Sequence, residues 1–416
     1  MKKLMAVLSV FALLLCGCSE QKNEQVNYPD SDMAWNKLNI METENGYYIK
    51  GNTSTLFLRY HDKKTGNEIM LCNKAECPHD GRETCTATYK DMPVSNIVLY
   101  NNALYFAGVE SDEENITVSL YKASCDGSAL DRICSLYSVK DGTETRMLGL
   151  YRSNLLIHRG YAFVNIDLYY IENINQYKGF IGGGYYKIDL RTNEKTVIKT
   201  YDDFWDEKFE KGIVIPCGNY IFKTKRDSDK TQFYRCGIDS DAPEEVFTES
   251  GQLSIMAADS KTLYVQEFPE DENNKKQQEI KIIEYDPETM EKKAQYTTCE
   301  GRFLAYEGKL YISSYNDEKN SITVYENGKK VFETENIPGG CDEYSSISIS
   351  DGKMYISKQS QPFFISEYWS CKIEDILSEN INWKSEYSTD ESAQKLDEYI
   401  RSKMESGEIY YSFNSF

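Results

Sequence analysis

A short phrase that recurs along the chain limits its fold more than any other feature: a turn residue followed by an apolar–aromatic–apolar triplet. The aromatic of this phrase occurs at seven positions: Tyr48, Tyr105, Phe163, Tyr220, Tyr264, Tyr311 and Tyr355. Successive positions are 57, 58, 57, 44, 47 and 44 residues apart. Recurrence at such a period indicates a repeat architecture in which each unit is one supersecondary structure.

Each unit also contains a second phrase, an aromatic strand that ends in a polar turn. Residues 58–62 and 120–123 are two copies, and the second leads into Asp126-Gly127. Asp-Gly and Asn-Gly are typical of tight hairpins, because both turn positions tolerate positive φ. The seventh copy, at 368–372, runs instead into Ile373-Glu374-Asp375. Units of about 45–50 residues built this way match four-stranded propeller blades.

The repeats therefore predict an all-β fold over residues 34–387, a seven-bladed β-propeller of four-stranded antiparallel blades. One such sheet cannot bury both of its faces, whereas blades stacked around an axis cover one another. The 33 tyrosines fit this arrangement, because a tyrosine fills the space between blades while its hydroxyl reaches water or backbone. Residues 38–41 supply a first strand for blade one, so we expect the ring to close without borrowing a strand.

Residues 388–416 are predicted to form a short C-terminal helix and a strand that dock on the propeller. Ser388 and Glu391 have the spacing of a capping box, which satisfies backbone N–H groups at a helix start. Apolar residues follow at helical spacing, at Ala393, Leu396, Ile400 and Met404. We expect this helix to lie on the rim of the propeller and to use its apolar stripe for packing.

The first residues predict export and lipid attachment. Residues 1–17 have a basic start and an apolar stretch of about a dozen residues, which is too short to span a bilayer and is typical of a signal peptide. Leu15-Cys16-Gly17-Cys18 is similar to the lipobox of bacterial lipoproteins, which predicts a diacylated Cys18 as the mature N-terminus. The alternative is an ordinary cleaved signal with free release. Residues 18–33 are polar and predict a flexible tether, so we expect a lipid-anchored protein on the extracytoplasmic face of the cell membrane.

Charge and cysteine content fit that location. The chain has 47 basic and 67 acidic side chains, a net charge of −20, and loss of Lys2 and Lys3 with the signal leaves −22. Such a charge repels phosphate backbones, so nucleic acid is not expected as a partner. Ten of the 12 cysteines lie beyond Cys18, in a compartment where disulfides persist. Cys217 with Cys236 and Cys125 with Cys134 are candidate pairs across neighbouring strands.

One constellation could carry chemistry: Cys72, Cys77, His79 and Cys85, spaced C-x4-C-x-H-x5-C directly after the last strand of blade one. Three thiolates and an imidazole suit a structural zinc ion in a tetrahedral Cys₃His site. The favoured alternative is a local disulfide with the third cysteine free or paired elsewhere, since an oxidising exterior removes thiolates by pairing. A redox or catalytic thiol is the third interpretation, although nothing in the sequence supplies an orienting group for Cys77 and His79.

Searches for other chemistry are negative. The sequence contains no G-x-S-x-G, H-E-x-x-H, P-loop or EF-hand motif. The two remaining histidines, His61 and His158, stand alone on expected strands, which favours structural roles. The long glycine-rich and aromatic insertion between Phe163 and Tyr185 is expected to be a loop that lines one mouth of the central channel.

The lipobox at residues 15–18, the tyrosine-rich repeats and the segment Leu71-Cys72-Asn73-Lys74-Ala75-Glu76-Cys77-Pro78-His79…Cys85 together resemble the propeller-type lipoproteins of Gram-positive gut bacteria. The resemblance covers most of the mature chain, and its most specific part is the cysteine–histidine segment. It implies the propeller fold and the lipid-anchored location. The family has no assigned activity, so the resemblance implies none.

The sequence favours a binding or scaffold propeller that engages an extracellular ligand such as a glycan, a peptide or an envelope protein. The reason is a rigid platform of many loops without a recognisable catalytic motif. The alternatives are a carbohydrate-active enzyme, a lyase or glycosidase with a pair of carboxylates at the channel mouth, and a structural subunit of a membrane-associated complex partnered by the C-terminal tail.

Overall fold

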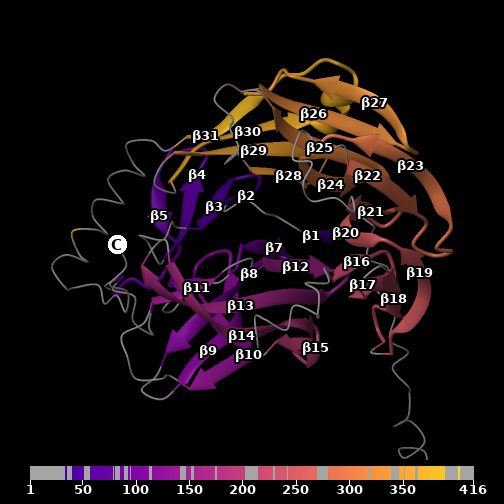
Figure 1. Cartoon of the computed structure of the whole chain (residues 1–416). Helices are drawn as coiled ribbons and strands as arrows, with labels where there is room; N and C mark the ends of the chain where they lie inside the picture. Colours follow the sequence, from indigo (N-terminus) through magenta and orange to yellow (C-terminus); the bar gives the residue numbers. More distant parts are fainter. Residues whose placement is uncertain are drawn as a thin grey trace, which may run out of the picture.

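The computed structural model describes residues 33–34, 40–50, 57–77, 79, 85–88, 92–93, 95–111, 115–140, 147–150, 154–173, 176–201, 214–227, 230–240, 242–268, 280–316, 319–338, 346–350, 352–360, 364–388 and 402. These residues form seven antiparallel sheets that follow one another around a ring. The ring passes from blade 1 through blades 2 to 6 and returns to blade 1 by way of blade 7 (Figure 1). The predicted seven-bladed β-propeller is therefore confirmed.

Each blade contains four strands that pair in the order of the sequence. Blade 1 comprises β2 (Ile40–Glu42), β3 (Gly46–Lys50), β4 (Leu58–Asp62) and β5 (Glu68–Met70). Blade 2 comprises β7 (Val98–Tyr100), β8 (Ala103–Ser111), β9 (Asn115–Ser124) and β10 (Leu130–Lys140), and blade 3 comprises β12 (Asn154–His158), β13 (Tyr161–Asn173), β14 (Gln176–Asp189) and β15 (Lys195–Tyr201). Blade 4 comprises β16 (Ile215–Cys217), β17 (Tyr220–Asp227), β18 (Lys230–Gly237) and β19 (Glu244–Ser250).

The last three blades repeat this arrangement. Blade 5 comprises β20 (Gln252–Ala258), β21 (Leu263–Phe268), β22 (Ile280–Tyr285) and β23 (Lys292–Thr298), and blade 6 comprises β24 (Arg302–Tyr306), β25 (Lys309–Asn316), β26 (Lys319–Glu326) and β27 (Lys329–Thr334). Blade 7 comprises β28 (Ser346–Ser350), β29 (Lys353–Ser360), β30 (Phe364–Lys372) and β31 (Lys384–Ser388), with the short helix α2 (Ile373–Leu377) before β31.

The repeated aromatic lies on the second strand of every blade, as the sequence period predicts. Six of the seven are buried, for example Phe163 and Tyr264, both 0% exposed, and only Tyr220 is partly exposed. A buried aromatic on each second strand packs the faces of neighbouring sheets together, which a single sheet could not achieve. The second phrase forms the third strand of each blade, from β4 to β30.

Three further short strands extend this plan. β1 (Met33–Ala34) pairs with β12, β6 (Met92–Pro93) pairs with β8, and β11 (Met147–Leu150) pairs with β13. The insertion between Phe163 and Tyr185, expected as a loop, is instead a continuation of β13 and β14, which remain paired from Tyr161–Asp189 to Asn173–Gln176. The alternation of apolar and polar residues that would mark these strands is obscured by the run Gly182-Gly183-Gly184.

Blades 1 and 7 are each built from one continuous segment, so the ring closes through side chains rather than through a shared strand. Tyr47, Ile49, Tyr355, Tyr368 and Tyr387 form the buried cluster between these two blades. The sequence prediction that blade 1 supplies its own first strand is confirmed by β2. Closure therefore depends on apolar packing and on the polar contacts embedded in it.

The N-terminal predictions for residues 1–17 and for Cys18 lie outside the described residues, as does the predicted tether except Met33. Of the helix and strand predicted for residues 388–416, the structure describes Ser388, which is the last residue of β31, and Ser402, which is helical; the rest lies outside the described residues. Within the described ranges, the short helix near the C-terminus is α2.

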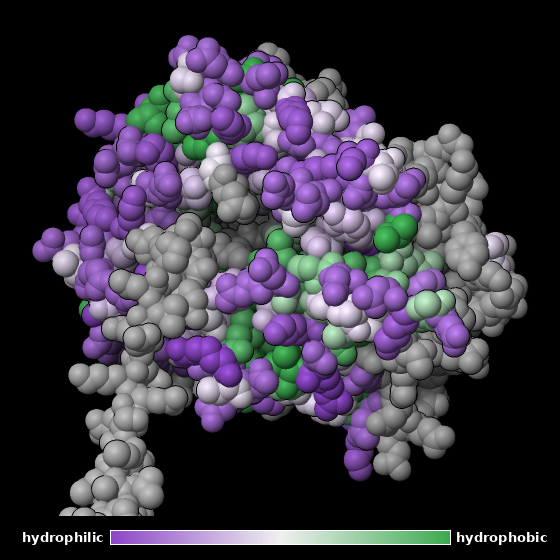
Figure 2. Space-filling model, turned by 180° about the vertical axis from the view of Figure 1, so that it is seen from behind, coloured by the Kyte–Doolittle hydropathy of each residue, from purple (hydrophilic) through white to green (hydrophobic). Residues whose placement is uncertain are grey.

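No helix in the described part of the chain is long and apolar enough to cross a membrane. The face seen in Figure 2 is mainly hydrophilic, in keeping with the net charge of −20.

Candidate metal centre

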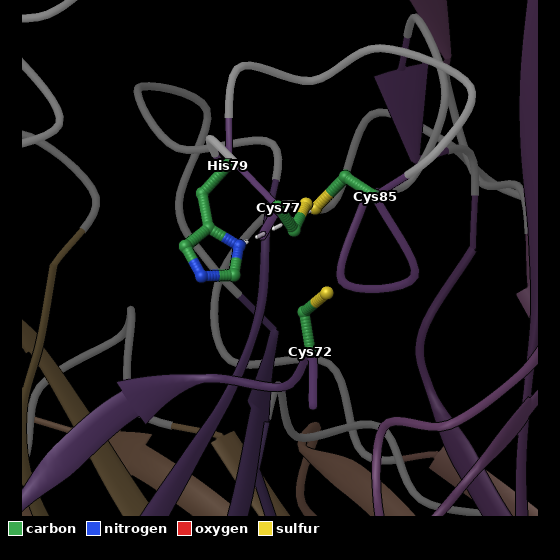
Figure 3. A group of neighbouring side chains, drawn as sticks. All are labelled: Cys72, Cys77, His79 and Cys85. Atoms are coloured by element: carbon green, nitrogen blue, oxygen red, sulfur yellow. Dashed lines mark hydrogen bonds between the residues drawn. The ribbon is translucent and has the colours of Figure 1, made fainter. Parts of the chain in front are cut away.

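The segment that follows β5 brings together all four residues that the sequence singled out, Cys72, Cys77, His79 and Cys85. Their ligand atoms all lie within 4.8 Å of one another, and their side chains converge on one point (Figure 3). Cys85 is buried and the other three are partly exposed. The structure therefore contains a Cys₃His cluster that could hold a metal ion.

Local backbone geometry produces this convergence. A tight turn, closed by the Cys77 N–H donating to the Lys74 carbonyl at 3.0 Å, reverses the chain between the first two cysteines. His79 then takes a left-handed conformation with φ of 51°, which costs a non-glycine residue about 1–2 kcal/mol. Such conformations persist where the surroundings enforce them and cluster at functional sites.

The distance between Cys85 and His79 suits tetrahedral coordination. Zinc–sulfur bonds of about 2.3 Å place two tetrahedral sulfur ligands about 3.8 Å apart. The Cys85 Sγ and His79 Nδ1 atoms are 3.8 Å apart, close to such an edge. A disulfide would instead bring one pair of sulfurs to about 2.05 Å and would leave the imidazole without a role. All nine described cysteines, including these three, are free thiols in this structure.

The protonation of the three thiols is unequal. Burial opposes ionisation of Cys72, but hydrogen bonds from the Thr86 side chain, from the backbone N–H groups of Lys74 and Thr86 and from Cys77 lower its pKa to about 7. Thr86 has a single hydroxyl proton, and its hydroxyl oxygen lies 2.6 Å from the Gly127 carbonyl oxygen, to which it donates. The backbone N–H groups are therefore the donors always available to the sulfur. Burial, followed by the neighbouring Cys77 and Cys72, raises the pKa of Cys85.

Backbone N–H groups therefore face two of the sulfurs, with Lys74 donating to Cys72 and Ala87 to Cys85. Each donor lies two residues after its cysteine. Donors of this kind stabilise the thiolate form and orient a metal ligand. Three clustered thiolates repel one another strongly unless a cation lies between them, and a dication would supply the missing charge.

The cluster also joins blade 1 to blade 2. The Asn73 N–H donates to the Gly127 carbonyl at 3.2 Å, and the Thr86 hydroxyl donates to the same carbonyl at 2.6 Å. Gly127 belongs to the turn between β9 and β10, and it approaches so closely that a Cβ atom there would lie 2.8 Å from the carbonyl carbon of Leu71. A side chain at this turn would push the two blades apart.

Sequence reasoning missed Thr86 and Gly127 as members of this site. Gly127 was recognised as a hairpin residue, but its contact with the cysteine segment joins positions more than 40 residues apart. The apolar base of the cluster, formed by Phe57, Met70 and Ala87, was also missed, although each of these residues lies within 15 positions of a cluster cysteine. No local pattern could have indicated the contact with Gly127.

The other predicted cysteine pairs are wrong. Cys217 lies on β16 opposite Tyr220, whereas Cys236 lies on β18 opposite Ile221, so β17 separates them. Two strand spacings of about 4.8 Å exceed the Cα separation that a disulfide tolerates. Cys134 is paired with Leu120, five residues along the chain from Cys125, so this pair does not meet either.

These cysteines and the isolated histidines have structural contacts instead. The Cys217 thiol donates to the Asp259 carbonyl at 2.7 Å, which joins blade 4 to blade 5. His158 is 1% exposed, and its Nε2 lies 2.8 Å from the Gly218 carbonyl, which joins blade 3 to blade 4. His61 packs against Tyr387 of blade 7 with ring centroids 5.1 Å apart. Both histidines thus make contacts between blades, as a structural role would require.

A cavity of about 270 Å³ lies between blades 3 and 4, and its lining includes Lys187, Lys223 and Arg235. Two of these cations are engaged by the protein. Arg235 pairs with Glu244 at 2.8 Å, and Lys187 contacts the carbonyls of Ile238 and Ser240. The third cation, Lys223, lies over the ring of Tyr234, with its Nζ atom 5.6 Å from the ring centroid.

Together the fold and the cluster define a seven-bladed β-propeller with a Cys₃His centre between its first two blades. No protein-family model and no curated protein sequence matches the chain. Among solved structures, the β-propeller domain of the Trilobed protease from Pyrococcus furiosus is 10% identical with a TM-score of 0.45, over 82% of this chain and 97% of that one.

Two further solved structures are similar in the same way. Acylaminoacyl peptidase from Pyrococcus horikoshii is 11% identical with a TM-score of 0.45, over 84% of this chain and 52% of that one, so this chain spans about half of the peptidase. TolB from Acinetobacter baumannii is 11% identical with a TM-score of 0.34, over 84% of this chain and 79% of that one. These likenesses concern the propeller fold and carry no argument about activity.

Proposed function

We propose that this protein is a lipid-anchored, extracytoplasmic binding or scaffold propeller, with a structural zinc ion held by Cys72, Cys77, His79 and Cys85. The observation that carries the proposal is the closed donor set. Four protein side chains converge on one point, which fills a tetrahedral shell and leaves no position for water or substrate. The most reactive group of side chains in the described residues is thus suited to a structural role.

The place of the cluster explains what such an ion would do. Blade 1 ends in the three-residue strand β5. The described part of the segment beyond it meets the Gly127 turn of blade 2 through the Asn73 N–H and the Thr86 hydroxyl, and Leu71 packs in the apolar cluster between the two blades. A metal ion would tie the positions of residues 72–85 together and hold the first blade against the second. Binding to the folded state alone would stabilise it by about 4 kcal/mol at a free ion concentration a thousandfold above the dissociation constant.

The test begins with metal analysis of the mature protein purified without reductant or chelator. One zinc ion per chain is expected, with substoichiometric content in Cys72→Ser and Cys85→Ser. Cys134→Ser is the matched control, because Cys134 is a partly exposed thiol on β10 of blade 2, outside the cluster. A chelator should lower the unfolding temperature of the wild type and of Cys134→Ser, and much less that of Cys72→Ser.

The competing disulfide has a distinct signature. Alkylation of the unfolded, unreduced protein followed by mass spectrometry counts the free thiols. Three reactive thiols at positions 72, 77 and 85 after metal removal support the zinc centre. A peptide in which two of them remain linked, together with an absence of metal, would overturn it.

The location and the role in binding rest on separate support. The lipobox at residues 15–18 supports the anchor, and a ring with seven sets of loops supports a platform for an extracellular glycan, peptide or envelope protein. The protein should float with vesicles when expressed with its signal peptide, whereas Cys18→Ala should remain in the soluble fraction. Saturable binding on glycan and peptide arrays is expected, and the absence of binding across broad arrays would contradict the platform.

A further inference from the structure

The short strand β1 shows where the N-terminal part of the chain enters the ring. Met33 pairs with His158 and Ala34 pairs with Ile157, antiparallel, on the free edge of β12. β12 is the first strand of blade 3, and the first strands face the middle of the ring, where Figure 1 also places β1. β1 further contacts β7, the first strand of blade 2. The chain therefore passes through the middle of the propeller before it forms blade 1.

The register gives the direction of entry. β12 runs from Asn154 to His158 and ends at the turn 159–160, where Gly160 has a φ of 80°. Because β1 is antiparallel and starts opposite His158, the chain reaches Met33 from the side of this turn. The turns between first and second strands, such as 101–102, 218–219 and 307–308, lie on the same side of the ring, because the first strands of all blades run in the same direction. We call this side the short-turn face.

The opposite side carries an extension of blade 3. β13 and β14 are 13 and 14 residues long, but β12 pairs only with Tyr161–Asn165 and β15 only with Gly183–Ile188. The remaining residues run on past the blade, with β11 alongside Leu168–Ile171. We call residues 147–150, 166–173 and 176–182 the blade-3 arm. Eight further residues of β13 reach up to about 26 Å.

β13 leads away from the short-turn face, because it begins at the turn 159–160. The arm and the entry of the N-terminal chain therefore lie on opposite sides of the ring. This arrangement follows from strand direction alone and does not depend on any side chain.

The short separation between Cys18 and Met33 limits how the propeller can be oriented at a membrane. A flexible chain of fifteen residues has an end-to-end distance of about 20 Å. A domain of some 350 residues has a radius of gyration of about 20 Å, so it is about 50 Å across. The span of the tether is thus shorter than the width of the domain. Such a tether keeps the side of the domain from which it emerges close to the membrane.

We infer that the propeller is held with its short-turn face toward the membrane and its blade-3 arm directed away from it, toward extracellular partners. This inference rests on the lipid anchor proposed above. The net charge of −22 of the whole mature chain should keep the domain from adhering to an anionic bilayer. The face presented to partners is then the one with the arm and the connections between blades.

The experiment uses the full-length lipidated protein in vesicles that contain a lipid-linked energy-transfer acceptor. A fluorescent amino acid is placed at Lys64 in blade 1, at Thr289 in blade 5, or at Gln176 at the tip of the arm. Lys64 and Thr289 are exposed in turns between third and fourth strands, which lie on the short-turn face because third strands run in the same direction as first strands. Transfer should be stronger from positions 64 and 289 than from 176. Equal transfer, or stronger transfer from 176, would overturn the inference.

Two controls separate this result from failure of the anchor. Cys18→Ala should lose vesicle flotation altogether, and a wild type that fails to float would refute the anchor rather than the orientation. A variant with about thirty Gly/Ser residues inserted after Ser19 has a tether whose span approaches the width of the domain. In this variant, the difference in energy transfer between positions 64 or 289 and position 176 should shrink. An unchanged difference would contradict the role of the tether.

Discussion

The hydroxyl of Tyr387, in the last strand of blade 7, donates a hydrogen bond of 2.8 Å to the buried carboxylate of Glu68 in blade 1. The same carboxylate accepts from Arg59 at 3.0 Å, and its side chain is 0% exposed. Residues 319 positions apart thus share one buried charge at the seam where the ring closes. Since no strand is exchanged across this seam, its polar contacts must be satisfied for the apolar cluster around them to stay packed.

Removal of the Tyr387 hydroxyl should weaken the closed ring. We expect Tyr387→Phe to lower the free energy of unfolding by about 1.5–3 kcal/mol, as for loss of a hydrogen bond to a charged group. Glu68→Gln should cost more, about 3–5 kcal/mol, because it removes the negative charge that faces the buried Arg59 guanidinium. Urea titration of both variants measures this.

Tyr234→Phe is the matched control for this pair, since the Tyr234 hydroxyl donates to Gln232 of its own blade at 3.3 Å and Tyr234 is partly exposed. It should change stability by no more than about 0.5 kcal/mol. A Tyr387→Phe variant as stable as this control would show that the seam does not limit unfolding.

The repeat aromatics offer a second comparison. Phe163 is 0% exposed between blades, and Phe163→Ala should destabilise the protein by about 3–5 kcal/mol. Tyr220 holds the same position in blade 4, but it is partly exposed and its hydroxyl contacts Glu288 at 2.8 Å. Tyr220→Ala should therefore lower the free energy of unfolding clearly less than Phe163→Ala. Equal losses in thermal unfolding would mean that the period marks local strand preference rather than packing between blades.

This comparison also shows how far sequence alone reaches. The period located all seven second strands, because an aromatic that must fill the gap between sheets recurs once per blade whatever the loops do. The same logic located the third strands and the self-sufficient blade 1. Spacing within fourteen residues was likewise enough to name all four members of the Cys₃His cluster, because local chain reversal can bring such neighbours together.

Contacts between distant segments could not be predicted in this way. The expected pairing of Cys217 with Cys236 failed because sequence indicates that a hairpin exists but not which strand lies between the two residues. The approach of Gly127 to Leu71 and the passage of Met33 beside His158 depend on how blades are set against one another. Such placement arises from the packing of whole sheets, which no local pattern records.

The glycine at the junction of blades 1 and 2 provides a matched test of that placement. Gly127 and Gly66 both have a φ of 71°, but a Cβ atom at Gly66 would meet nothing within 4 Å, whereas at Gly127 it would lie 2.8 Å from the backbone of Leu71. Gly66→Ala should cost only the left-handed conformation, about 1–2 kcal/mol. Gly127→Ala should cost more and should also reduce the zinc content per chain. Similar losses of stability with unchanged metal content would show that the two blades are not held at this turn.

Buried and exposed aspartates should respond to pH in opposite directions. Burial raises the pKa of Asp259, although backbone N–H groups of Gly308, Lys261 and Thr262 partly offset it. A carboxyl group whose pKa is raised on folding contributes stability below its unfolded pKa, and this stability is lost as the pH rises through the folded pKa. The difference in unfolding free energy between Asp259→Asn and wild type should therefore shift in favour of the variant between pH 4 and pH 7.

Asp286 is the counterpart, because hydrogen bonds led by the Thr289 backbone N–H lower its pKa in the exposed turn after β22. Its contribution is present above the unfolded pKa and is lost as the pH falls through the folded one. The free energy of unfolding of Asp286→Asn should therefore fall relative to that of the wild type as the pH rises from about 2 to about 5, a range that lies below that of Asp259. Urea titrations of the three proteins at matched pH values give both differences. A change of the two differences in unfolding free energy in the same direction with pH would show that burial does not set the ionisation of Asp259. It would also contradict a desolvated contact between Asp259 of blade 5 and Gly308 of blade 6.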